Sequence, residues 1–176
     1  MKKFLVLGFV VFVFLFLNQT MTSSITIPED AIRFRVIASS NSKEDQEVKQ
    51  IVSKTLEKEI SSRLLNAKTH KDAEAILTSS LPVFQNLVAK TLQDNHVYQT
   101  FKIHYGKNYF PEKVYNGVTY KEGEYDSLVV TLGNGLGDNW WCVLFPPLCL
   151  MEAEEETSSE EIEYRFFLKD WLDQYF

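Results

Sequence analysis

The sequence predicts an α+β domain with an N-terminal strand, two amphipathic helical segments and then an antiparallel sheet with a hairpin. Three patterns support this fold class. Apolar and polar residues alternate over 32–38, which is the period of a half-buried strand. Apolar residues recur at intervals of three and four over 43–64 and 70–92, which is the period of a helix. Alternation returns after Asn95 and continues to Phe145.

Residues 1–24 are predicted to form a secretory signal peptide. Lys2 and Lys3 precede the run Phe4–Leu17, which contains no charged residue. The 14 residues of this run would reach about 21 Å as a helix, whereas a spanning helix must cross about 30 Å of hydrocarbon. We therefore expect export rather than anchoring, with cleavage near Thr22–Ser24, where small side chains stand without an Ala-x-Ala box.

The exported chain is predicted to form one globular domain over residues 25–151. The leader holds 2 of the 18 basic residues, so 16 basic and 24 acidic residues remain and the net charge is −8. This balance argues against nucleic acid or an anionic membrane surface as the partner, because both carry negative charge.

The helices have recognisable starts. Ser42 and Asp45 have the spacing of a capping box, and so do Thr69 and Asp72. The first helix should run to about residue 64. Pro82 should kink or split the second helical segment, since proline cannot donate the backbone hydrogen bond that a helix interior needs.

The second half of the domain is predicted to be a sheet. Residues 97–105 alternate, and 125–132 and 141–145 have the composition of strands. Val114–Tyr115 and Val118–Tyr120 flank Asn116-Gly117, the strongest short signal for a hairpin, because both turn positions must tolerate positive φ.

The last segments differ sharply in composition. Residues 152–163 contain seven glutamates among twelve residues and are predicted to be an acidic, solvated linker. Residues 164–176 are predicted to form a short helix. This helix either docks on the domain or presents its apolar stripe to a partner or membrane. The stripe consists of Phe167, Leu168, Trp171, Leu172, Tyr175 and Phe176.

The chain contains two cysteines, Cys142 and Cys149. Disulfides persist in the compartments that exported proteins reach, so we expect a disulfide between them that shapes the loop over Pro146 and Pro147. A catalytic thiol is the alternative.

The motifs of common enzyme classes are missing from the sequence. No Gly-x-Ser-x-Gly elbow, His-Glu-x-x-His helix or Walker loop is present. His70, His96 and His104 lack the spacing of metal ligands, so no metal and no cofactor are expected.

Two alternative functions remain open at this point. The first is a cysteine hydrolase or transpeptidase that uses Cys142 or Cys149 with His104, oriented by Asp126 or Asn139. The second is a module that binds the cell wall.

The most unusual segment runs from Thr131 to Cys149. Its glycines, paired tryptophans and double proline combine a turn-rich part with a stiff part, and large aromatics beside a stiff turn are typical of an anchor for a partner. We expect partner contacts from this segment, with Arg33 and Arg35 as a second candidate. The alternative is that the tryptophans merely alternate between the two faces of a strand. The expected contact residues are Asn134, Gly135, Asn139, Trp140, Trp141, Phe145, Pro146 and Pro147.

At these residues the chain resembles the stage II sporulation protein R family of endospore-forming bacteria. The resemblance is carried by the segment 132–149, and it covers nearly the whole exported chain. The acidic linker is shorter here than in some relatives. Further matching elements are Ile27-Pro28, Asp30 to Arg33, Ala38, Ser40, Tyr115 to Gly117, Gly123 to Tyr125, Phe166 to Leu168 and Trp171.

The resemblance implies a signal rather than an enzyme. Members are made in the forespore under its early sigma factor and exported into the space between the forespore and mother-cell membranes. There they activate a membrane-embedded aspartic protease of the mother cell, the sigma-E factor processing peptidase, which removes the pro-sequence of the sigma-E precursor.

Overall fold

The structure is a computed structural model, and it describes residues 25–26, 28, 30–115 and 118–148. These residues belong to two compact units, one with residues up to 29 and 110–123, the other with the rest. The predicted signal peptide, acidic linker and C-terminal helix lie outside the described residues.

The smaller unit contains a three-stranded sheet in the order β1-β5-β4. Strand β1 (Ile25–Thr26) runs parallel to β5 (Val118–Tyr120). Strand β4 (Lys113–Tyr115) pairs antiparallel with β5, with Tyr115 opposite Val118. This pairing confirms the predicted hairpin, whose two turn residues lie outside the described residues.

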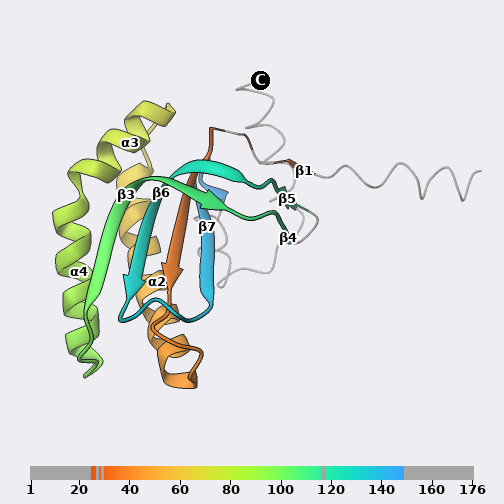
Figure 1. Ribbon diagram of the computed structural model, residues 1–176. Helices are drawn as coiled ribbons and strands as arrows, with labels where there is room; N and C mark the ends of the chain where they lie inside the picture. Colours follow the sequence, from red (N-terminus) through yellow and green to blue (C-terminus); the bar gives the residue numbers. More distant parts are fainter. Residues whose placement is uncertain (1–24, 27, 29, 116–117, 149–176) are drawn as a thin grey trace, which may run out of the picture. The chain divides into compact units, whose positions relative to one another are not determined.

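The larger unit contains a four-stranded sheet in the order β3-β6-β2-β7 (Figure 1). Its strands are β3 (Phe101–Phe110), β6 (Gly123–Leu132), β2 (Ile32–Ile37) and β7 (Asn139–Phe145). Strand β2 is parallel to β6 and antiparallel to β7, so the sheet is mixed and not antiparallel throughout as expected. The reason is geometric: β2 lies between two consecutive strands that run in opposite directions, and it must be parallel to one of them.

Three helices lie on one face of this sheet (Figure 1): α2 (Lys43–Leu64), α3 (His70–Ser79) and α4 (Leu81–Asp94). Among the described residues, no helix is long and apolar enough to cross a membrane. The α+β fold class is therefore confirmed, with the helices packed in a single layer.

The predicted helix boundaries agree with the structure. The hydroxyl of Ser42 accepts the backbone N–H of Asp45, and the capping box of Thr69 and Asp72 is complete in both directions. The second helical segment is split just before Pro82, which lies in the first turn of α4. Proline is tolerated there because the N–H groups of a first turn have no partner within the helix.

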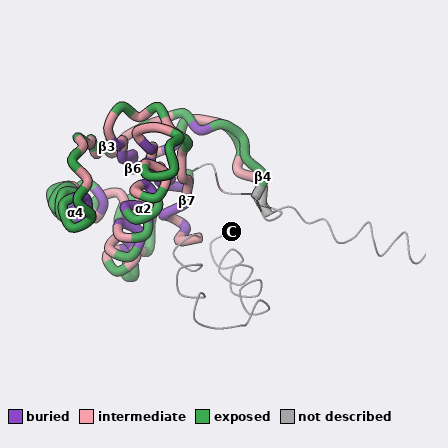
Figure 2. Tube along the Cα trace, turned by 90° about the horizontal axis from the view of Figure 1, so that it is seen from below, coloured by how far each residue is buried: buried purple, intermediate pink, exposed green. Residues whose placement is uncertain are grey.

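The core lies between the sheet and the helices. Buried residues line the strands and the inner faces of the helices (Figure 2). Each strand contributes every second residue, as the pleat requires. The strand residues of this core are Ile32, Phe34, Val36, Leu128, Val130, Leu132, Cys142 and Leu144, and the helix residues include Val52, Leu56, Ile60, Leu77, Phe84 and Val88.

Strand β3 begins at Phe101, four residues later than the alternation from Val97 predicted. The carbonyl of Thr100 accepts the N–H of Gly133 at 2.7 Å, and His96 has φ of +57°. The segment 97–100 is therefore held by the loop that follows β6, and its alternation does not reflect strand pairing.

Truncation of Phe84 tests the position of the core. Phe84 is fully buried, whereas its neighbour Val83 is 39% exposed. Phe84→Ala should lower the free energy of unfolding by about 3–5 kcal/mol, and Val83→Ala by less than about 1 kcal/mol, because only the first leaves a cavity. Denaturant titration measures the free energy of unfolding of both variants. Equal losses would contradict the assignment of Phe84 to the core and of Val83 to the surface.

Candidate partner-binding surface

The loop that joins β6 to β7, residues 133–138, is called the glycine loop here. It is hydrogen-bonded to the segment 38–42 that joins β2 to α2. Leu136 donates its N–H to the carbonyl of Ser39 at 3.1 Å, and Gly137 donates to Ala38 at 2.9 Å. The parallel strands β2 and β6 end at the same edge of the sheet, so their following loops meet there.

Glycine is required at three positions of this loop. Gly133 and Gly135 have φ of +51° and +66°, values that side-chain-bearing residues rarely adopt. Gly137 allows a close approach of two backbones: a Cβ there would lie 2.6 Å from the carbonyl carbon of Ser40 and 2.8 Å from Cβ of Ala38. The glycines therefore allow the turns of the loop and its close packing against the segment 38–42.

A buried lysine joins the glycine loop to helix α2. Lys49 is only 4% exposed, and its ammonium donates to the carbonyl of Asp138 at 3.1 Å and to Oε1 of Gln46 at 2.5 Å. The N–H of Asp138 in turn donates to Oδ1 of Asn41 at 2.7 Å. Buried polar groups are costly unless bonded, so these contacts hold one arrangement of the loop.

Two large apolar side chains protrude at this edge. Leu136, at the tip of the glycine loop, is 81% exposed, and Tyr98, in the segment before β3, is 91% exposed. The hydrogen bond from Gly133 to Thr100 joins their two segments. We define the loop edge as residues 38–42, 95–100 and 133–138. It presents apolar anchors on a hydrogen-bonded backbone, the arrangement that suits protein recognition.

Two buried polar atoms lie in or next to the loop edge. Nε2 of Gln99 and Oδ1 of Asn139 are buried and have no hydrogen-bond partner among the described residues.

The two tryptophans of β7 point to opposite faces of the sheet. Trp140 packs edge-on against Phe34 on the helix-covered face, with ring centroids 5.4 Å apart and planes at 80°. Trp141 lies on the second face, where the guanidinium carbon of Arg35 is 5.3 Å from its ring centroid. Trp140 thus contributes to the core, and the pair does not form one aromatic patch.

The expected contact residues lie at both ends of β7. Asn134 and Gly135 are in the loop edge and Asn139 directly follows it, whereas Phe145, Pro146 and Pro147 lie at the other end of β7. The strand's 7 residues separate the two groups by about 20 Å. Pro146 is buried and follows a cis peptide bond.

Tyr98 and Leu136 were not among the expected residues. Leu136 had a usable signal, an apolar residue between two glycines. Tyr98 had none, because the alternation from Val97 assigned it to a strand.

The second face of the sheet carries both arginines of β2. The guanidinium carbon of Arg33 lies 3.5 Å above the ring centroid of Tyr125, and Arg33 is 3% exposed. Burial lowers the pKa of the Arg35 guanidinium from its ordinary value, but arginine stays charged at neutral pH. Both guanidinium groups on this face therefore carry a positive charge.

Among the described residues, the predicted cysteine-enzyme site is not assembled around Cys142. Cys142 points into the core on the helix-covered face. His104 is exposed and alternates with the core-facing Ile103 and Tyr105, so it lies on the other face. Asp126 pairs with other groups, Nε2 of His70 at 3.5 Å and Nζ of Lys107 at 3.6 Å. The bond from Cys142 to Cys149 stays a prediction, because Cys149 lies outside the described residues.

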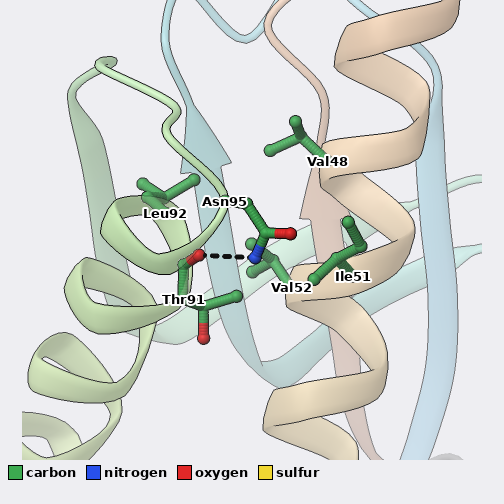
Figure 3. Close-up of a pocket in the computed structure, with 6 residues that line it drawn as sticks. All are labelled: Val48, Ile51, Val52, Thr91, Leu92 and Asn95. Carbon is green, nitrogen blue, oxygen red and sulfur yellow. Dashed lines mark hydrogen bonds between the residues drawn. The ribbon is translucent and has the colours of Figure 1, made fainter.

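A shallow depression between α2 and α4 is apolar (Figure 3). Its amide-bearing residue, Asn95, donates to the carbonyl of Thr91 at 2.8 Å. Within the described part of the chain, no three His, Cys, Asp or Glu residues are grouped to hold a metal. The depression therefore lacks the convergent charged groups of an active site. The depression is lined by Val48, Ile51, Val52, Thr91, Leu92 and Asn95.

Comparison with known proteins identifies the family. The family model for stage II sporulation protein R matches residues 28–155, which include the loop edge and the strands on both sides of it. The chain belongs to the stage II sporulation protein R family. This membership confirms the resemblance predicted from the segment 132–149, and it supports a role in sporulation.

A curated relative belongs to the same family. The chain is 34% identical over 146 residues to stage II sporulation protein R of Bacillus subtilis (strain 168). The match covers 83% of this chain and 65% of the relative, so the chain spans just under two thirds of that protein. No solved structure matches the chain.

Substitution of Gly137 tests whether the glycine loop packs closely against the segment 38–42. Gly137→Ala would place a methyl group against the backbone of Ser40, so it should lower the free energy of unfolding by about 1–3 kcal/mol. Gly106→Ala is the matched control. Its methyl group would meet only the side chain of exposed His104, at 2.8 Å from Nε2, and that ring can move. Chemical denaturation of both variants makes the comparison, and a loss at Gly137 no larger than at Gly106 would argue against docking.

Proposed function

We propose that this chain is an exported sporulation signal that activates a membrane-embedded aspartic protease of the mother cell. It is made in the forespore and acts in the space between the forespore and mother-cell membranes. Activation of the protease starts processing of the sigma-E precursor. The chain acts by binding and performs no catalysis itself.

The observation that carries this proposal is the family match over residues 28–155. It includes the glycine loop, whose backbone is bonded to two other segments and to Lys49. The basic leader and apolar run of residues 1–24 support export. The assembled surface favours binding over catalysis, because Cys142 and His104 lie on opposite faces of the sheet.

An activator must bind the active arrangement of its target more tightly than the inactive one. A ligand with equal affinity for both arrangements shifts no equilibrium. A loop held in one conformation suits this task, because little conformational entropy is lost when it binds. We therefore assign the contact to the loop edge, with Leu136 and Tyr98 as its apolar anchors.

Placing a negative charge at each apolar anchor tests the proposal. Leu136→Asp and Tyr98→Asp should each cut processing of the sigma-E precursor in sporulating cells. Burying a side chain of this size contributes about 1.5–3 kcal/mol, so its loss should weaken binding about 10- to 150-fold. Immunoblotting of precursor and product over the course of sporulation measures the effect.

Leu65→Asp is the matched control. Leu65 is 75% exposed and follows the C-terminal end of α2, whereas the loop edge lies at its N-terminal end. The helix has 22 residues, so about 33 Å separates the two sites. Normal processing in all three strains, with the variants folded and exported, would reject the loop edge as the contact.

A further inference from the structure

The second face of the larger sheet is built to bind carboxylates. Arg33 and Arg35 are on β2, with Arg33 stacked on Tyr125 and Arg35 facing Trp141. Stacking uses the flat face of a guanidinium, while its five N–H donors point outward in its plane. Two such groups on alternate residues of one strand lie about 7 Å apart, a spacing that neighbouring carboxylates on an extended chain can match.

This face also requires a covering segment. Val129 and Val143 are 7% and 1% exposed, and Arg33 is 3% exposed. The three described helices all pack on the opposite face (Figure 1). A sheet face with apolar and charged side chains this buried needs a second layer.

We propose that the acidic segment 152–163 of the same chain covers this face and pairs its glutamates with Arg33 and Arg35. The segment holds seven glutamates among its twelve residues, which complements the two guanidinium groups. Carboxylates are the groups that arginine binds with two parallel hydrogen bonds.

The connection is long enough for this placement. Strand β7 ends at Phe145, which pairs with Ile32, the neighbour of Arg33. The described chain ends at Leu148, and the four residues to Glu152 can reach about 13 Å. Twelve extended residues span up to about 40 Å, which exceeds the roughly 20 Å length of the 6-residue strand β2.

The family model ends at residue 155, inside the segment, so most of the cover lies beyond the part of the chain that the model matches. The inference is independent of the proposed function, and its test needs no protease.

Zero-length crosslinking of the full chain tests the inference. Arg35→Lys keeps the positive charge and supplies an amine that a carbodiimide couples to a contacting carboxylate. We expect peptides that join position 35 to residues 152–163 within a monomer. Their yield should be at least about tenfold above that for Lys58, because contact raises the effective concentration of the two groups.

Lys58 is the native control, since it is exposed on α2, on the far side of the sheet. Arg33→Lys provides a second amine on the same face if the first variant unfolds, as circular dichroism will reveal. The proposal fails if a folded variant gives no such peptide, or if the peptides appear only between two chains. Equal yields at Lys58 and position 35 would also overturn it.

Discussion

The close approach of Gly137 to Ser40 is the contact on which the rest of the larger unit depends. It lets the loop after β6 cross the end of β2, so that β7 can pair with β2 on the side away from β6. The hydrogen bonds of Leu136 and Gly137, together with the ammonium of Lys49, then hold this crossing in place. A side chain at position 137 would push the two backbones apart, so sheet order and loop conformation have one common cause.

The same contact connects the fold to the proposed signalling role. Because the glycine loop is bonded to segments on both sides, its exposed leucine sits on a backbone that is already ordered. A partner therefore meets a preformed surface and loses less binding energy to ordering. The second sheet face works differently. Its charge favours an acidic occupant, and the chain carries an acidic segment of its own.

Features set by local chemistry could be predicted from the sequence. The capping residues Ser42 and Thr69, the split at Pro82 and the β4–β5 hairpin all depend on residues within a few positions of each other. The insertion of β2 between β6 and β7 could not be predicted, because alternation reports which face a residue occupies and not which strand lies beside it. For the same reason, the sequence did not reveal that Tyr98 and Leu136 lie at one edge. The expected contact residues of this loop stay a prediction, and what the sequence could not show is that the ring of Trp140 packs on Phe34.

The most direct test of the central claim is photocrosslinking in a reconstituted membrane that contains the protease. A photoreactive amino acid at Leu136 should crosslink to the protease, whereas the same group at Leu65 should not, although both side chains are exposed. Crosslinking from position 136 above the level at position 65 would support the loop edge as the contact with the protease. Equal crosslinking at the two positions, or crosslinking only at 65, would contradict it.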